Sequence, residues 1–251
     1  MFWRMARFAW RVWRVSRHGT ELERYQLAER LSNLVYPKYR FSEYGRLFLE
    51  DSSFITFYHR YHADSHALDR LYVVREFMKL VRHIPGDTAE CGVYEGASSE
   101  VMCQGRGELP RRHHVFDSFA GLSAPGRADG SYWHEGDLTS PEATARKNLA
   151  PYAEVEFHVG WIPSRFPEVE GSSFALVHID VDLHDPTRDA VAFFYPRLQP
   201  GGILLFDDYG FTTCPGATLA IDRYFADDPS RIIMLPTGQA FVMRPAASSG
   251  P

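Results

Sequence analysis

The chain has 251 residues, 45% of them hydrophobic and 24% charged. This is the composition of a globular protein, and it excludes a disordered, collagen-like or fibrous chain. No apolar run approaches the roughly 18–20 residues that a membrane-spanning helix requires. The three cysteines form neither a C-x-x-C pair nor a disulfide framework. We therefore expect a reducing, cytoplasmic location.

Charge is distributed unevenly along the chain. The formal net charge is −5, yet residues 1–18 contain five arginines and no acid, so the remainder is strongly acidic. An acidic body repels phosphate backbones, and we predict no nucleic-acid partner. Arginines spaced by three or four residues among tryptophans predict a basic, aromatic, amphipathic arm over residues 1–18. Two roles fit it: peripheral contact with a membrane surface, or packing on the domain or on another copy in a homo-oligomer.

The rest of the chain divides into an N-terminal extension and a main domain. Residues 19–65 are expected to form helices and loops, residues 66–245 the main domain, and residues 246–251 a flexible tail. Within the main domain, a Gly-, Pro- and Ser-rich segment carries Tyr132 and His134. Loops of this length inside a compact domain are usually functional, so we predict a lid at about residues 119–138.

The main domain alternates between apolar runs and amphipathic stretches. Helices are predicted at 66–83, from 98 onward, at 139–149 with a Thr139/Glu142 capping box, and at 186–198; strands at 88–93, 114–117, 155–159, 174–179 and 203–206; and a closing hairpin from 232–235 and 240–243. This alternation predicts an α/β fold with a mostly parallel sheet and helices on both faces.

The first predicted strand ends in a glycine turn that suits a nucleotide-like ligand. Ligands of such sheets bind beyond the carboxyl ends of the strands. Gly92 and Gly96 permit a tight turn and a close backbone approach before a helix N-terminus. Tyr94 stands where the middle glycine of G-x-G-x-x-G would fall, which disfavours a nicotinamide oxidoreductase. Asp117, at the next strand end, is placed to accept hydrogen bonds from ribose hydroxyls. Trp161, after the third strand, either lies beside a flat heterocycle or fills the core.

Four aspartates follow the fourth and fifth predicted strands: Asp180, Asp182, Asp207 and Asp208. Burying them together without a counter-charge is costly or forces protonation. A divalent cation such as Mg²⁺, which prefers carboxylate oxygens, solves this problem. Asp180 and Asp182 are two residues apart and share a side while the backbone remains extended, so that one ligates the metal and the other faces the substrate. His178 and His184 flank the acids as packed, hydrogen-bonded side chains.

These motifs together resemble the macrocin O-methyltransferase (TylF/MycF) family over about residues 66–243. The resemblance is carried by Glu90 to Gly96, Asp117-Ser118-Phe119-Ala120-Gly121-Leu122, Gly160-Trp161, Ile179 to Leu183, and Leu198 to Gly202 leading into Asp207-Asp208-Tyr209. It implies a Rossmann-like class I methyltransferase with a mostly parallel seven-stranded sheet, a closing antiparallel hairpin and an N-terminal helical extension. It also implies S-adenosylmethionine and Mg²⁺ as cofactors, and a sugar hydroxyl of a natural product as acceptor. The basic, aromatic arm over residues 1–18 suggests a lipid-linked or cell-surface glycan as acceptor instead.

The resemblance also implies roles for individual residues. Asp180, Asp207 and Asp208 would be the metal ligands and Asp182 the general base. The implied cofactor contacts are Glu90, Gly92, Val93, Tyr94, Gly96, Ser98, Asp117, Ser118, Gly160, Trp161 and Asp180, and the expected substrate contacts are Tyr132, His134 and Tyr209. Two alternatives stay open: a metal-dependent methyltransferase of a phenolic catechol, and a non-catalytic binder of an adenosyl cofactor that serves as a partner subunit.

Overall fold

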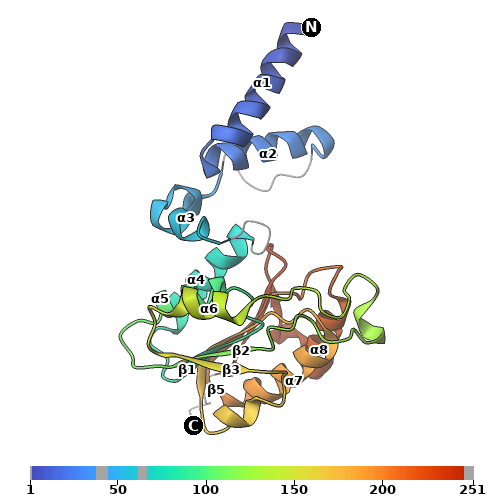
Figure 1. The fold of residues 1–251 in the computed structure, drawn as a ribbon. Coiled ribbons are helices and arrows are strands. Elements are labelled where there is room, and N and C mark those ends of the chain that lie inside the picture. Colours follow the sequence, from blue (N-terminus) through green and yellow to red (C-terminus); the bar gives the residue numbers. More distant parts are fainter. Residues whose placement is uncertain (1, 38–44, 62–66, 246–251) are drawn as a thin grey trace, which may run out of the picture. The chain divides into compact units, whose positions relative to one another are not determined.

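The computed structural model describes residues 2–37, 45–61 and 67–245 (Figure 1). The chain forms two compact units, Met1–Ser65 and His66–Pro251. The predicted flexible tail, residues 246–251, lies outside the described residues. Within the described residues, none of the helices is both long enough and apolar enough to span a membrane.

The first unit is helical. It contains α1 (Phe2–His18), α2 (Glu21–Val35), the 3-10 helix η1 (Leu47–Glu50) and α3 (Ser52–Tyr58). Thr20 begins α2 through a capping box with Glu23, in which each side chain binds the other residue's backbone N–H. The carboxylate of Asp51 caps α3 by accepting from Ser53 and Phe54.

The second unit is built on a seven-stranded sheet in the order β3-β2-β1-β4-β5-β7-β6. Its strands are β1 (Asp87–Cys91), β2 (His113–Asp117), β3 (Val155–Val159), β4 (Phe174–Ile179), β5 (Leu198–Phe206), β6 (Ile233–Met234) and β7 (Ala240–Met243). The first five are parallel, whereas β7 pairs antiparallel with both β5 and β6. The predicted mostly parallel sheet with a closing hairpin is therefore confirmed. The strand order reverses between β1 and β4, which is where such sheets bind their ligands.

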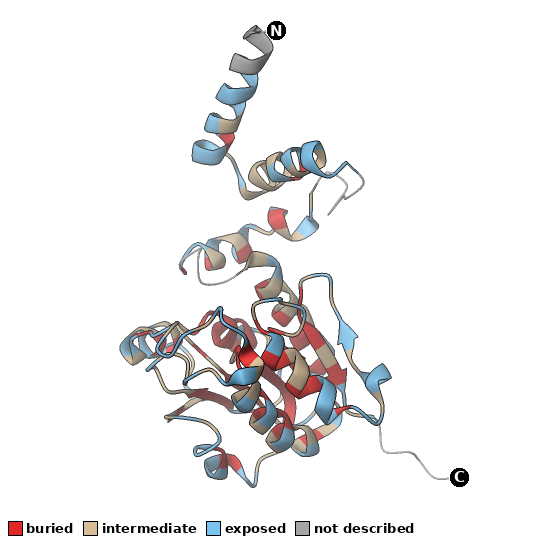
Figure 2. Cartoon of the chain, turned by 90° about the vertical axis from the view of Figure 1, so that its right-hand side faces the viewer, coloured by how far each residue is buried: buried red, intermediate tan, exposed pale blue. Residues whose placement is uncertain are grey.

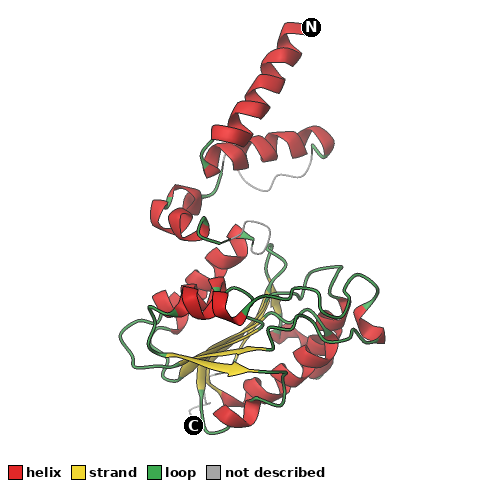
Figure 3. Cartoon of the chain, in the orientation of Figure 1, coloured by secondary structure: helices red, strands yellow, loops and turns green. Residues whose placement is uncertain are grey.

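Helices cover both faces of this sheet. They are α4 (Leu68–Val81), α5 (Ala97–Gln104), α6 (Glu142–Leu149), α7 (His184–Phe194) and α8 (Pro215–Tyr224). Figure 1 shows α4, α5 and α6 on one face and α7 and α8 on the other, and Figure 3 shows the strands enclosed between these helices. Short 3-10 helices lie in the connections: η2 (Arg127–Asp129), η3 (Phe166–Val169), η4 (Tyr195–Arg197) and η5 (Pro229–Arg231).

The central strands are buried on both sides, as Figure 2 shows by colour. Every residue of β4 is buried, including His178. Parallel strands enclosed by helices become continuous apolar runs, which explains why the sequence pattern located them. The acids that follow these strands, Asp180 and Asp207 among them, fall at the strand ends, where the candidate site lies.

One local prediction is wrong. Thr139 and Glu142 do not form a capping box, because α6 begins only at Glu142, after Pro141. The Thr139 hydroxyl instead donates to the backbone carbonyls of Ala120 and Gly136, at 3.2 and 2.6 Å. It therefore ties together the two ends of the predicted lid.

Candidate active site

The ends of β1 and β4 meet through backbone contacts that require a glycine. Gly92 directly follows β1 and has a φ of +83°, in the left-handed region. A Cβ atom there would lie 1.7 Å from the carbonyl oxygen of Asp180. The Asp180 N–H in turn donates to the Cys91 carbonyl at 2.9 Å. Gly92 thus brings the predicted cofactor turn against the first of the four aspartates.

The aspartates fall into two groups of potential metal ligands. One is His178, Asp180 and Asp207; the other is Asp182, Asp208 and Cys214; within each group the ligand atoms lie within 4.8 Å of one another. Of the predicted metal ligands, Asp180 and Asp207 are therefore in the first group and Asp208 in the second.

Asp182 does not continue the direction of β4. The strand ends at Ile179, and Asp182 adopts a φ of +57°. We predicted that Asp180 and Asp182 point to the same side, which requires an extended backbone between them. Because Asp182 is left-handed, the backbone is not extended there, and the reason for that prediction does not hold. Left-handed non-glycine residues are uncommon and cluster at functional sites. The Asp182 N–H donates to the Asp208 carboxylate at 2.9 Å, which helps hold this turn.

Asp207 has several hydrogen-bond partners. Arg70, from α4, forms an ion pair with one carboxylate oxygen. The other oxygen accepts from Gln239, at 2.7 Å, and faces Nε2 of His178 at 3.2 Å. Burial alone would raise the pKa of Asp207, but His178 and Arg70 outweigh it and lower this pKa to about 2. Asp207 is therefore ionised at neutral pH, and its charge is neutralised by the partly exposed Arg70 and the buried His178.

His178 connects Asp207 to the predicted cofactor turn. Its Nδ1 lies 2.8 Å from Glu90, its register partner on β1. Burial opposes protonation, but the hydrogen bonds to Asp207 and Glu90 raise the pKa of His178 well above its ordinary value. Glu90 is fully buried and also accepts from the Ser98 and Ser99 hydroxyls. The imidazolium of His178 thus joins two carboxylates on neighbouring strands.

Asp180 stands apart because its carboxylate has no hydrogen-bond donor among the residues that the structure describes. Burial, then the charges of Asp207 and Asp208, raise the pKa of Asp180 well above its ordinary value. It lines a small pocket together with Arg70, Ser98, His178 and Asp207, and with apolar residues of α4. A partly buried carboxylate without a donor in a pocket is in a position to bind a cation.

Asp182 is linked to the predicted lid through Cys214. The Cys214 thiol lies 3.5 Å from the Asp182 carboxylate, and the indole N–H of Trp133 donates to this sulfur at 3.4 Å. Burial, and secondly the charge of Asp180, raise the pKa of Asp182 to about 7. Within the same loop, Asp129 accepts from the backbone N–H of His184 at 2.6 Å. The segment 119–138 is thus bound to the aspartate end of the sheet.

Asp117 holds the cofactor turn closed. Its carboxylate accepts from the backbone N–H groups of Val93 at 2.7 Å, Tyr94 at 3.0 Å and Phe119 at 2.7 Å. A carboxylate offers about four acceptor positions, so about one remains for a ribose hydroxyl. Tyr94 and Phe119 both adopt left-handed conformations, with φ of 49° and 55°. These bonds stabilise two unfavourable backbone conformations next to the predicted ligand.

The residues expected beside the adenine lie at the ends of β2 and β3. Ser118 shapes the loop by donating to the Gly121 carbonyl at 3.3 Å and accepting from the Ala120 N–H at 3.1 Å. The Gly160 N–H donates to the Asp117 carbonyl at 2.9 Å. Trp161 is 46% exposed, so its indole does not fill the core. The structure therefore contradicts the interpretation that Trp161 fills the core and agrees with a ring that is accessible to a ligand.

The three expected substrate contacts differ in their exposure and in the partners of their polar groups. Tyr132 is 60% exposed, and the His134 ring forms an exposed ion pair with Asp137 at 3.6 Å. The Tyr209 hydroxyl instead donates to Asp222 of α8 at 2.7 Å. Partial burial, and secondly Asp222, raise the pKa of Tyr209 to about 12. In this structure Tyr209 therefore anchors α8 to the end of β5.

Four residues of the site were not predicted: Arg70, Gln239, Trp133 and Cys214. Arg70 lies on a helix whose apolar spacing was recognised, but nothing in that spacing indicates which of its charged residues faces the aspartates. Trp133 lies in the predicted lid, and its position beside Tyr132 was the only signal available.

The strand order, the turn after β1 and the acids at the ends of β4 and β5 define a class I methyltransferase fold. The profile of the macrocin-O-methyltransferase (TylF) family matches residues 65–229, and the chain belongs to this family. This confirms both the resemblance seen in the sequence and the predicted fold.

Known relatives and solved structures agree with this assignment. The chain is 34% identical over 161 residues to 8-demethyl-8-(2,3-dimethoxy-alpha-L-rhamnosyl)-tetracenomycin-C 4'-O-methyltransferase of Streptomyces olivaceus, covering 58% of this chain and 62% of that relative. The structure of the O-methyltransferase NovP matches with a TM-score of 0.61 and 25% identity over 71% of this chain and 81% of that one. A calicheamicin methyltransferase matches in fold, with a TM-score of 0.65 and 20% identity over 90% and 94% of the two chains. The chain thus spans less than two thirds of the curated relative's length.

Proposed function

We propose that this protein is an S-adenosylmethionine- and Mg²⁺-dependent O-methyltransferase that acts on a sugar hydroxyl of a glycosylated natural product or cell-surface glycan. The observation that carries the proposal is the Asp180 carboxylate, which has no hydrogen-bond donor among the described residues and lines a pocket with Asp207. The family assignment supports methyl transfer, and the rhamnosyl group in the name of the Streptomyces olivaceus relative supports a sugar acceptor.

The donor set suits a hard divalent cation. Asp180 and Asp207 of the first group and Asp208 of the second offer carboxylate oxygens, which Mg²⁺ prefers over nitrogen or sulfur. Burial and mutual repulsion raise the pKa values of Asp180 and Asp208, and a dication would favour their ionised forms. When bound, Mg²⁺ lowers the pKa of a coordinated hydroxyl and so makes it a better nucleophile. Arg70 occupies one oxygen of Asp207 and must give way if the ion takes that oxygen.

The turn after β1 suits S-adenosylmethionine, which supplies the methyl group on a sulfonium. Gly92 allows close approach of a ligand to the backbone. Asp117 retains about one acceptor position for a ribose hydroxyl. The exposed indole of Trp161 can stack on a purine. Glu90 and Ser98 hold the beginning of α5 beside this turn.

Asp182 is suited to accept the proton that the hydroxyl loses. Its pKa of about 7 matches the requirement for a general base near neutral pH. The hydrogen bond from its own backbone to Asp208 and the contact with Cys214 fix its position. Trp133 connects the segment 119–138 to Cys214, and this loop would exclude water from the reacting groups.

Transfer of a labelled methyl group tests the proposal. Purified protein would be incubated with Mg²⁺ and labelled S-adenosylmethionine, using one panel of glycosylated acceptors and one of catechols. We expect label on a sugar hydroxyl and its loss on chelation. Labelling of a catechol alone would show that the acceptor is phenolic and not a sugar. Binding of S-adenosylhomocysteine without transfer to any acceptor would favour the non-catalytic alternative.

Helix α1 supports a further proposal about location. Its arginines Arg7, Arg11 and Arg14 recur at spacings of three and four residues, and its indoles Trp10 and Trp13 are 62% and 55% exposed. Guanidinium groups bind anionic headgroups, and indoles insert at the acyl boundary. We therefore propose a cytoplasmic protein that binds peripherally to an anionic membrane surface through α1.

A further inference from the structure

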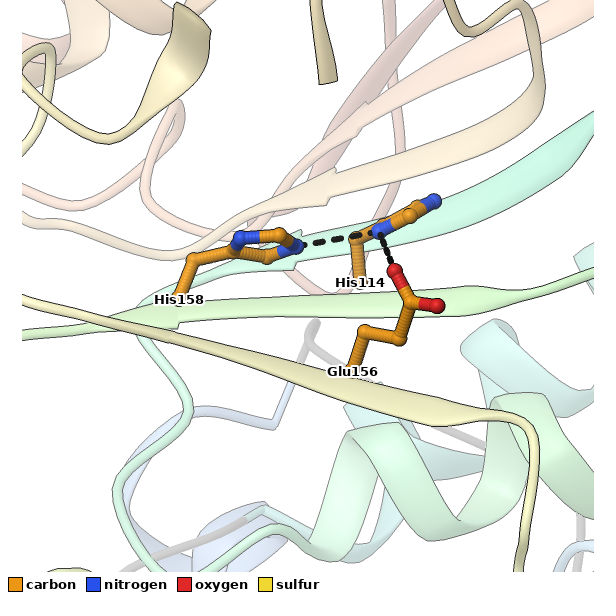
Figure 4. A group of neighbouring side chains, drawn as sticks. All are labelled: His114, Glu156 and His158. Atoms are coloured by element: carbon orange, nitrogen blue, oxygen red, sulfur yellow. Dashed lines mark hydrogen bonds and ion pairs between the residues drawn. The ribbon is translucent and has the colours of Figure 1, made fainter. Parts of the chain in front are cut away.

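A third group of possible metal ligands lies on β2 and β3. His114 of β2 is the register partner of Glu156 of β3, and His158 lies two residues further along β3 on the same face. Figure 4 shows the three side chains converging. The Nδ1 atom of His114 lies 3.0 Å from Nε2 of His158 and 3.5 Å from a Glu156 oxygen.

The outer nitrogen of each histidine faces a carboxylate. Nε2 of His114 lies 3.2 Å from Asp87, and Nδ1 of His158 lies 2.6 Å from Glu168. An aspartate or glutamate carboxylate with an ordinary pKa is ionised at neutral pH and can only accept a hydrogen bond. At these distances the outer nitrogens of His114 and His158 are therefore the donors and carry the protons.

This tautomer leaves an electrostatic problem at the centre of the group. With their protons on the outside, His114 Nδ1 and His158 Nε2 present lone pairs to each other at 3.0 Å, and Glu156 adds a negative oxygen. Arg112 pairs with the other Glu156 oxygen at 2.9 Å, but with this tautomer none of the described residues places a donor hydrogen between the three converging atoms. Only a cation between them makes the arrangement favourable: a shared proton, or a metal ion.

We propose that His114, Glu156 and His158 form a zinc site separate from the aspartate cluster. Two histidines and one glutamate are a known set of zinc ligands, with a water as the fourth. Ligand bonds of about 2.0–2.1 Å in tetrahedral geometry place ligand atoms about 3.3 Å apart. Two of the three separations, 3.0 and 3.5 Å, bracket this value, and all three lie within 4.8 Å.

The surroundings match those of zinc sites in other respects. Histidines that bind zinc usually donate their second N–H to a carboxylate, as His114 and His158 do here. Both histidine side chains are buried, whereas that of Glu156 is 41% exposed, which leaves a path for the ion from solvent. Imidazole ligands favour zinc over Mg²⁺, so the two sites would select different metals.

The proposed zinc would join the outer strand β3 to its neighbour β2. His114 lies in the first half of β2, whereas the aspartates follow the carboxyl ends of β4 and β5. The ion would therefore stabilise the edge of the sheet that carries Gly160 and Trp161 at its end. This inference does not depend on the proposed function.

Cobalt provides a spectroscopic probe of the site. The full chain would be stripped with a chelator, supplied with millimolar Mg²⁺ to cover the aspartates, and titrated with Co²⁺ and then Zn²⁺. We expect about one equivalent of Co²⁺ with the intense visible bands of tetrahedral coordination, displacement by Zn²⁺, and a rise in melting temperature. Asp180→Asn should leave these signals unchanged, because it belongs to the other site.

Two substitutions assign the signals to these residues. Glu156→Gln, at a partly exposed position, should abolish tight binding, whereas Glu168→Gln, which keeps all three ligands, should weaken it about 10–100-fold. Glu170→Gln, at an exposed position nearby, is the matched control and should bind normally. Absence of tetrahedral bands, or bands and affinity that persist in Glu156→Gln, would overturn the proposal and leave a histidine pair that shares a proton.

Discussion

Arg70 of α4 forms an ion pair with Asp207 after β5, across 137 residues of sequence. The guanidinium places a positive charge beside a cluster of four aspartates, three of which are buried. Asp207 is thereby kept ionised, while Asp180, Asp182 and Asp208, which lack such a partner, have raised pKa values. The ion pair and a bound Mg²⁺ would therefore compete for the same carboxylate.

Replacing Arg70 tests this competition. Arg70→Gln leaves Asp207 buried with His178 as its remaining cationic neighbour. The metal-free protein should therefore lose roughly 2–3 kcal/mol of unfolding free energy, less than for a fully buried pair, because Arg70 is partly exposed. Mg²⁺ should then bind more tightly and raise the melting temperature by more than in the wild type. Arg70→Lys, which keeps the charge, is the control. An equal Mg²⁺-dependent shift in Arg70→Gln and the wild type would contradict the competition.

Asp182→Asn tests the general base. The amide cannot take up the proton, so methyl transfer should fall about 10²–10⁴-fold. Binding of S-adenosylhomocysteine, measured by calorimetry, should remain within a few-fold of the wild type. Asp227→Asn, at an exposed position, provides a control with the same change in charge. A rate for Asp182→Asn close to that of the control would remove Asp182 from the role of base.

Gly92→Ala tests the close approach of β1 and β4. Its methyl group would lie 1.7 Å from the Asp180 carbonyl at a φ of +83°, so both a clash and backbone strain oppose it. We expect a loss of at least about 2–3 kcal/mol in urea unfolding and weaker cofactor binding. Gly171→Ala has nothing within 4 Å of its Cβ and should change stability by less than about 0.5 kcal/mol. Similar stabilities for the two variants would refute the contact.

Because His113 is buried, we expect the free energy of unfolding to decrease in mild acid. It is buried between Thr88 and Ser99, and burial lowers its pKa to about 4, below the 6.5 of an unperturbed histidine. The unfolded chain therefore takes up a proton first as pH falls from 6.5 to 4, and the stabilisation that is complete above pH 6.5 is lost in this window. Between pH 7 and 5 the loss is about 2 kcal/mol.

Urea unfolding at both pH values measures this loss. His113→Gln lacks the titrating ring, so the decrease in its unfolding free energy between pH 7 and 5 should be smaller than that of the wild type by about 2 kcal/mol. Parallel decreases in the two proteins would show that His113 is not the responsible group.

Vesicle flotation tests α1. The wild type should float with anionic vesicles at low salt and less at high salt, because guanidinium–headgroup attraction is screened. Trp10→Ser combined with Trp13→Ser should reduce flotation strongly, whereas Leu34→Ser, which changes an exposed apolar residue of α2, should not. If the wild type stays unbound, α1 serves assembly rather than a membrane, and sedimentation would then show whether removing the indoles changes the oligomeric state.

The sequence by itself determined the class of fold and the four acids. Strands enclosed by helices on both faces must be continuously apolar, so β4 and the second half of β5 could be located from local pattern alone. Acids that directly follow such runs, Asp180 and Asp207 among them, fall at strand ends for the same reason. These features depend on burial, and burial determines which positions of the sequence are apolar.

Only the tertiary structure decided how these acids are paired. No periodicity indicates that Arg70 faces Asp207, or that Trp133 reaches Cys214 beside Asp182, because each pair joins segments far apart in the chain. The left-handed turn at Asp182, which separates it from Asp180, is likewise held by a contact with Asp208. Charge and hydrogen-bond pairing depend on distances of a few ångströms, and the packing of helices on the sheet sets these distances.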